Sequence, residues 1–130
     1  MTSVVLDASA VLAVVNAEPG ADMVRASLAG AIMSAVNYSE VLKKTIERGG
    51  TGEAAASFVR GLSVAIIPFD ETLAAVSADL YLQTKEHGLS LADRACLALG
   101  VQQNRRVLTS ERRMALPALT VKVKLIRNAN

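Results

Sequence analysis

The sequence is short of the residues that many functional sites require. It has a single histidine, His87, and a single cysteine, Cys96, which excludes sites built from two histidines or from clustered thiolates. We expect His87 to end a helix and Cys96 to lie in the core. Tryptophan is absent and aromatic residues make up only 3% of the chain. Stacking on nucleic acid bases is therefore scarce, and a bound RNA would be held mainly through its phosphates and shape.

The chain also lacks a long uncharged segment. The longest such segment, 26–39, has 14 residues and contains Gly30 and Asn37, so it is too short to span a membrane. No lysine or arginine precedes Arg25, and Asp7 would lie in the apolar part of any signal peptide. With only one cysteine in the chain, these absences predict a reducing, cytoplasmic setting and no membrane partner.

The length and the apolar content bound the domain organisation. A chain of 130 residues fits one domain, 1–130, which buries about two-thirds of the surface that its unfolded form exposes. Hydrophobic residues make up 52% of the chain and the mean hydropathy is +0.35, which is high for so small a domain. This apolar excess predicts burial against a partner protein or against a second copy in a homodimer.

Positive charge is concentrated at the end of the chain. The net charge is only +2, yet half of the lysines and arginines lie in 105–130, together with one acid, Glu111. A basic segment of this kind attracts phosphate groups. The same residues also fit an ordinary solvated surface in which lysines alternate along an edge strand. The sequence leaves both interpretations open.

Short apolar runs alternate with helical patterns, which predicts an α/β domain with a mainly parallel sheet. The predicted strands are 3–7, 31–34, 63–68, 107–109 and 120–126. The last of these alternates apolar with charged residues, so we expect it at a sheet edge. The predicted helices are 9–16, 21–29, 37–49, 53–60, 70–86 and 90–103, with Asp70 as the cap of the fifth.

Asp7 is the residue that folding alone explains least. It follows Val4, Val5 and Leu6, an apolar run that predicts a strand buried on both faces. Burying an unpartnered carboxylate costs several kcal/mol, so Asp7 needs a cation, hydrogen-bond donors or a chemical role. Ligands of open α/β sheets bind beyond the carboxyl ends of the strands, where Asp7 lies. The plainer interpretation is that Asp7 caps the helix that begins near Ser9.

Three further acids stand at predicted structural transitions. Glu40 and Asp93 lie in the first turns of helices, where Asn37-x-x-Glu40 and Ser90-x-x-Asp93 both fit a capping box. Glu111 directly follows the fourth predicted strand, where it also fits a turn residue paired with Arg112 or Arg113. Each acid taken singly therefore has a structural explanation.

Taken together, the four acids predict a shared site. Strand ends and the first turns of helices can all lie at one edge of a parallel sheet. Like charges about 4 Å apart repel by about 4 kcal/mol at an effective dielectric constant near 20, so such a cluster must bind cations or protons. Carboxylate oxygens are hard ligands that suit Mg²⁺ or Mn²⁺.

Four blocks of the sequence resemble the signature of PIN-domain ribonucleases. The blocks are 5–12, 39–41, 89–99 and 107–111. Their order and spacing, and the chain length, are similar to those of the VapC-type toxins of bacterial and archaeal toxin–antitoxin systems. The resemblance covers essentially the whole chain, although 49–84 match only by pattern. It implies a magnesium-dependent ribonuclease with a three-layer α/β/α sandwich, held inactive by a cognate antitoxin and usually homodimeric.

The resemblance also assigns roles to single residues. Asp7, Glu40 and Asp93 match the acidic triad of the family, and Glu111 takes the fourth acidic position. There the sequence departs from the family, which more often has aspartate after the Thr-x pair. Because glutamate is longer by one methylene group, the sequence leaves open whether Glu111 binds metal directly or through water.

By the same resemblance, Ser9 and Thr109 donate hydrogen bonds to the acids around the metal. Metal held by Asp7 and Asp93 would lower the pKa of a bound water, which attacks a phosphorus of the RNA backbone. Glu40 would orient that water. Whether one or two ions take part stays open.

The sequence is compatible with two other functions. A PIN-like module whose altered fourth acid has cost it activity would bind RNA and Mg²⁺ without turnover. A phospho-receiver signalling domain would use Asp7 and Asp70, but it lacks a second acid beside Asp7 and leaves Glu40 and Asp93 unexplained. Cleavage of RNA would distinguish a nuclease from the inactive binding module. Acylation of Asp70 by a phosphodonor would distinguish the receiver domain from a nuclease.

Overall fold

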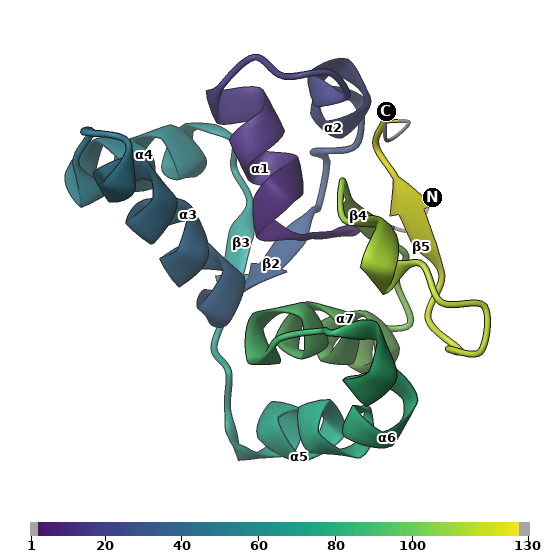
Figure 1. Cartoon of the computed structure of the whole chain (residues 1–130). Helices are drawn as coiled ribbons and strands as arrows, with labels where there is room; N and C mark the ends of the chain where they lie inside the picture. The colour runs from purple at the N-terminus through teal and green to yellow at the C-terminus, as the bar shows by residue number, and fades with distance from the viewer. Residues whose placement is uncertain (1–2, 128–130) are drawn as a thin grey trace.

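A computed structural model of the chain describes residues 3–127, and its centre is a five-stranded parallel sheet (Figure 1). The strand order is β3-β2-β1-β4-β5, and every neighbouring pair runs parallel. The strands are β1 Val5–Leu6, β2 Ile32–Ser34, β3 Ala65–Ile67, β4 Val107–Thr109 and β5 Val123–Leu125. The predicted α/β fold with a parallel sheet is confirmed.

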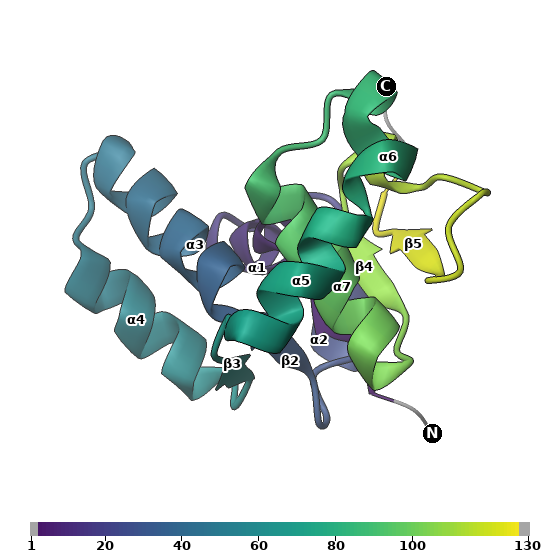
Figure 2. The ribbon, with the colours of Figure 1, turned by 90° about the horizontal axis from the view of Figure 1, so that it is seen from below.

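Helices cover both faces of this sheet. The α-helices are α1 Ala8–Val15, α2 Ala21–Ala26, α3 Ala35–Glu47, α4 Gly52–Gly61, α5 Glu71–Asp79, α6 Tyr81–Thr84 and α7 Leu91–Gln103. Two short 3₁₀ turns, η1 Lys85–His87 and η2 Arg112–Met114, complete the secondary structure of the described residues. Helices α1 to α4 pack on one face and α5 to α7 on the other, as Figures 1 and 2 show. These layers form the expected three-layer α/β/α sandwich.

Strand β1 contributes to both hydrophobic cores. Val5 packs into the core beneath α5 and α7, whereas Leu6 packs into the core beneath α1 and α3. Both side chains are fully buried, because consecutive residues of a strand point to opposite faces. Burying each such side chain contributes about 1.5–3 kcal/mol, and this holds the first strand in the middle of the sheet. Asp7 is therefore fixed at the carboxyl end of a central strand.

Helix caps explain where several elements begin. Ser90 and Asp93 form the predicted capping box at the start of α7, and the Asp70 carboxylate accepts a hydrogen bond from the Leu73 N–H at the start of α5. The capping box predicted at Asn37 is wrong. Helix α3 begins two residues earlier, and the Ser34 hydroxyl caps it. The Asn37 side chain is thereby free for contacts inside the protein.

Two predicted elements differ from the structure for physical reasons. The helix predicted over 70–86 is divided at Leu80, so that α5, α6 and η1 follow one another. The strand predicted as buried over 63–68 is β3, a half-exposed edge strand that pairs only with β2. Its apolar run indicated burial, but an edge position leaves one side uncovered. The last predicted strand does lie at the opposite edge, as β5.

Two smaller predictions are confirmed. His87 ends η1, and Gly88 follows it in the left-handed conformation. Cys96, on α7, is fully buried in the hydrophobic core beneath α5 and α7. Within residues 3–127, no helix combines the length and the apolar character needed to cross a bilayer.

Candidate functional site

The strands end side by side at one edge of the sheet, and Asp7 lies at the centre of that edge. The Asp7 N–H donates to the Leu108 carbonyl at 3.0 Å, which fixes the residue beside the end of β4. Only 4% of Asp7 is exposed. Although Asp7 stands at the N-cap position of α1, its side chain makes no capping hydrogen bond. The interpretation of this carboxylate as a helix cap is therefore wrong.

Two hydroxyl groups hold the Asp7 carboxylate. The Ser9 hydroxyl donates to Asp7 Oδ2 at 2.8 Å, and the Thr109 hydroxyl donates to the same oxygen at 2.7 Å. The hydroxyls themselves accept from the backbone, Ser9 from the Ser110 N–H and Thr109 from the Glu111 N–H, both at 2.9 Å. Each hydroxyl thus accepts a hydrogen bond from a backbone N–H and donates its one proton to Asp7. The arrangement orients one oxygen of the carboxylate and stabilises its negative charge.

Asn37 is the residue of this site that the sequence analysis missed. Its side chain is fully buried, and Nδ2 lies 3.0 Å from the Ala92 carbonyl, 3.3 Å from Glu40 Oε1 and 3.5 Å from Asp7 Oδ1. One neutral amide thus joins α3, the end of β1 and α7. Asn37 Oδ1 has no hydrogen-bond partner within the described residues. The only signal in the sequence was an asparagine three residues before an acid, and the same pattern fits a helix cap.

The pKa values of Asp7 and Glu40 are both raised, and neighbouring carboxylates contribute to each shift. Burial raises the pKa of Asp7 above its ordinary value of 3.8; the two hydroxyl hydrogen bonds oppose this rise and the charge of Asp93 adds to it. Burial also raises the pKa of Glu40, against the hydrogen bond from Asn37 and with a further rise from the charges of Asp7 and Asp93. Asp7, Glu40 and Asp93 therefore form one electrostatic cluster.

Cys96 gives a second indication of the same cluster. Burial raises the pKa of its thiol well above 9.0, and the charges of Asp7, Asp93 and Glu40 raise it further. A thiol that stays protonated in this way is neither a nucleophile nor a metal ligand. Cys96 therefore packs behind the acids as an apolar residue.

The fourth predicted acid is placed differently. Glu111 Oε1 accepts a hydrogen bond from Arg113 Nε at 3.0 Å, and the two side chains are 41% and 52% exposed. A second nitrogen of Arg113 donates to the Gly88 carbonyl at 2.9 Å. The alternative that Glu111 pairs with a neighbouring arginine is thus confirmed for Arg113. The backbone of Glu111 still lies next to the site, because its N–H donates to Thr109.

The donor chemistry of the cluster fits a hard divalent cation. The Asp7 and Glu40 carboxylates both lie at the Asn37 amide, and among residues 3–127 the buried carbonyl oxygen of Asn37 has no donor. These are the ligand types that Mg²⁺ and Mn²⁺ prefer. In the part of the chain from 3 to 127, however, no three histidine, cysteine or acidic side chains converge as a preformed metal site. Side-chain rotation would have to accompany metal binding.

Comparison with known proteins connects this geometry to a family. No curated protein sequence matches the chain significantly. Among solved structures, a toxin–antitoxin complex from Klebsiella pneumoniae has a TM-score of 0.75 at 16% identity, covering 98% of this chain and 100% of that chain. VapC20 of Mycobacterium tuberculosis, described as a sarcin-ricin loop cleaving toxin, has a TM-score of 0.74 at 16% identity, covering 91% and 97%. FitAcB from Neisseria gonorrhoeae has a TM-score of 0.60 at 23% identity, covering 92% and 95%.

These structural likenesses establish a shared fold. The sequence profile of the PIN domain matches residues 4–118, a range that includes strands β1 to β4 and all four predicted acids. The chain therefore belongs to the PIN domain family.

Proposed function

We propose that this chain, acting as one domain, is a Mg²⁺-dependent endoribonuclease and the toxin of a toxin–antitoxin pair. The observation that carries the proposal is the buried Asp7 carboxylate at the carboxyl end of β1, which shares the Asn37 amide with Glu40 and whose pKa is raised by burial and by the charge of Asp93. An acid with only 4% of its surface exposed, held by two hydroxyls and a buried amide, has no role in folding that an apolar residue would not serve better.

Within this proposal, the residues divide the work as follows. Asp7 and Asp93 would hold the ion, which when bound supplies an activated water and neutralises charge on the phosphate. Ser9 and Thr109 keep the Asp7 carboxylate oriented through their hydrogen bonds. Glu40, half-buried and with a raised pKa, would accept a proton from the attacking water. Glu111 would join the site after releasing Arg113.

The partners proposed for this protein follow from its surface. RNA would be gripped through phosphates, since 105–130 are rich in arginine and lysine and aromatic residues are few. Several large apolar side chains are exposed, among them Leu82 at 74%, Leu91 at 55% and Tyr81 at 51%. Surface of this kind suits an antitoxin or the second copy of a homodimer. The Klebsiella relative was solved as a toxin–antitoxin complex, which supports an antitoxin partner.

The decisive experiment measures cleavage of structured RNA by the purified protein in Mg²⁺ and in EDTA. Asp7→Asn and Asp93→Asn should each abolish cleavage, because each removes a proposed metal ligand while keeping the shape of the side chain. The matched control is Asp79→Asn, which removes an exposed acid at the end of α5, and it should cleave like the wild type. Cleavage that survives EDTA or Asp7→Asn would show that the activity does not come from this site.

One observation favours a second candidate, an RNA-binding module with little or no turnover. Glu111 is engaged by Arg113, so the fourth acid is not directed at the other three. In that case RNA and Mg²⁺ would bind without cleavage, and Arg113→Ala would leave turnover absent. The receiver interpretation gains no comparable support, since the Asp70 carboxylate serves as the cap of α5.

A further inference from the structure

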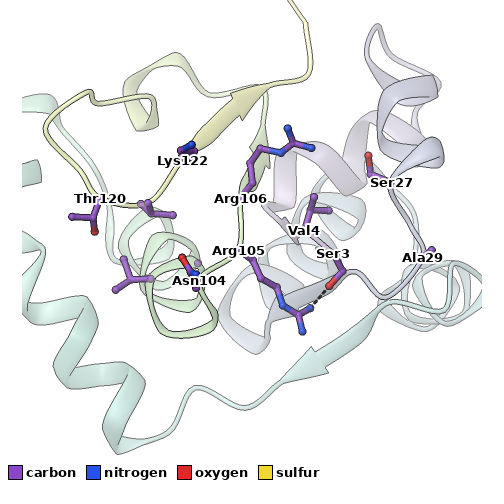
Figure 3. Close-up of a pocket in the computed structure, with 12 residues that line it drawn as sticks. Ser3, Val4, Ser27, Ala29, Asn104, Arg105, Arg106, Thr120 and Lys122 are labelled. Atoms are coloured by element: carbon purple, nitrogen blue, oxygen red, sulfur yellow. Dashed lines mark hydrogen bonds between the residues drawn. The ribbon is translucent and has the colours of Figure 1, made fainter. Parts of the chain in front are cut away.

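A second candidate site lies at the amino ends of the strands, across the sheet from the carboxyl ends where Asp7 lies. Figure 3 shows a cavity of about 660 Å³ bordered by Ser3, Val4, Arg105, Arg106 and Lys122. These residues precede β1, β4 and β5, so they stand at the amino ends of the strands. Asp7 and Glu111 follow the carboxyl ends of β1 and β4. The cavity and the active site are therefore separate places on the molecule.

The strand register brings the cations of the cavity together. Val107 of β4 pairs with Val5 of β1 and with Val123 of β5, so Arg106 and Lys122 both directly precede paired positions. Arg105 and Arg106 are consecutive, and both line the cavity. Figure 3 shows them on either side of Val4. Three positive side chains thus line one cavity.

No acid compensates these charges. The residues that line the cavity include no aspartate or glutamate, and the ion pairs found between residues 3 and 127 do not involve Arg105, Arg106 or Lys122. Arg105 is held in place, because its guanidinium donates to the Ser3 hydroxyl and to the Gly30 carbonyl. Arg106 and Lys122 are exposed. The cavity is therefore lined by one guanidinium held by hydrogen bonds, that of Arg105, and by two exposed cationic side chains, those of Arg106 and Lys122.

The rest of the lining fits an organic phosphate better than a bare ion. Val4, Val101 and Val121 supply apolar surface, and the exposed side chain of Asn104 supplies an amide beside Arg105. A volume of about 660 Å³ is within the range of small-molecule sites. A phosphate group would meet the cations while an attached sugar or base lies over the valines.

We propose that this cavity binds the phosphate group of a nucleotide or of an RNA strand. Arg106 and Lys122 bind the phosphate oxygens, and Arg105 supplies a preorganised guanidinium held by its contacts with Ser3 and Gly30. The proposal does not depend on the proposed ribonuclease activity, because it concerns binding at the amino edge of the sheet.

The test is a binding titration of the full chain in EDTA, where hydrolysis does not interfere. The probes are inorganic phosphate, adenosine monophosphate and a short single-stranded RNA, followed through the backbone amide resonances. Signals of Ser3, Asn104 and Arg105 should move, and that of Asn37 should not. The variant Arg106→Ala/Lys122→Ala should weaken binding by about tenfold or more, since charge-assisted hydrogen bonds are lost. The control Arg48→Ala/Arg60→Ala removes the same charge from exposed positions outside the cavity.

The probes also separate the two sources of the phosphate. A free nucleotide as ligand predicts that adenosine monophosphate binds more tightly than the RNA. An RNA strand as ligand predicts tighter binding of the RNA, with a slope of about −2 for log affinity against log salt, or about −0.7 for each of three phosphate contacts. Equal weakening by the control variant, or resonance shifts confined to the carboxyl edge, would overturn the proposal. Neither result depends on whether the protein cleaves RNA.

Discussion

Asn37 offers the sharpest test of how the acidic cluster is held together. Its amide nitrogen lies between Glu40 Oε1 and Asp7 Oδ1, at 3.3 Å and 3.5 Å, so a neutral donor separates two carboxylates. Two substitutions probe this role in different ways. Asn37→Ala removes the donor, whereas Asn37→Asp keeps the shape of the side chain and replaces the donor by a further carboxylate.

The structure sets the expected magnitudes. Losing the hydrogen bonds of Asn37 leaves buried acceptors without a donor, which costs about 1–3 kcal/mol. A charged oxygen at the position of Nδ2 would repel each neighbouring carboxylate by about 5 kcal/mol at an effective dielectric constant near 20. The new acid would take up a proton instead, and at pH 7 this costs about 4 kcal/mol for an ordinary aspartate. In EDTA we therefore expect Asn37→Asp to be the less stable variant.

Thermal unfolding in EDTA and in millimolar Mg²⁺ measures this difference. At about 4 °C per kcal/mol for a domain of this size, the Tm should fall by about 8 °C in Asn37→Ala and by about 16 °C in Asn37→Asp. Mg²⁺ should restore more stability to Asn37→Asp, because a cation neutralises the added charge and gains a ligand. If both variants lost the same stability and Mg²⁺ shifted both equally, the acids would not share a cation site.

Two further predictions concern the stability of the fold, one at Asp7 and one at Gly100. Because burial raises the pKa of Asp7 above 3.8, the folded protein binds this proton more tightly than the unfolded chain does, and the free energy of unfolding should fall as pH rises through the raised pKa. Urea denaturation over a pH series in EDTA should show this fall in the wild type and a smaller one in Asp7→Asn; a rise over the same pH range would contradict the assignment. A Cβ on Gly100 would lie 2.8 Å from side-chain carbons of Val107 and Val121, so Gly100→Ala should cost about 1–3 kcal/mol through overpacking. Gly61→Ala, whose Cβ would meet no atom within 4 Å, is the control, and equal stability of the two variants would refute the packing argument.

The fold was accessible from the sequence because its signals are local. Apolar runs predicted the central strands, and Ser90, Asp93 and Asp70 predicted two helix starts through hydrogen bonds that span three residues. The errors lie where tertiary contacts decide. Leu80 interrupts a helix that the pattern predicted as continuous, and β3 is apolar in sequence but half-exposed at its edge. An uninterrupted apolar run such as 63–68 does not distinguish a central strand from an edge strand, whereas the alternation in 120–126 did predict an edge.

The candidate site was accessible only in part, for the same reason. Asp7 stood out because a carboxylate after a buried strand is costly without partners, but those partners come from segments far apart in the chain, including Asn37 and Thr109. Asn37 also fitted a helix cap, and only the earlier start of α3 at Ser34 turns its side chain inward. Moving the cap of α3 from Asn37 to Ser34, three residues earlier, therefore converts a predicted capping residue into the donor between Asp7 and Glu40. The position of that start, where the Ser34 hydroxyl caps the helix, determines whether the Asn37 amide can reach both carboxylates.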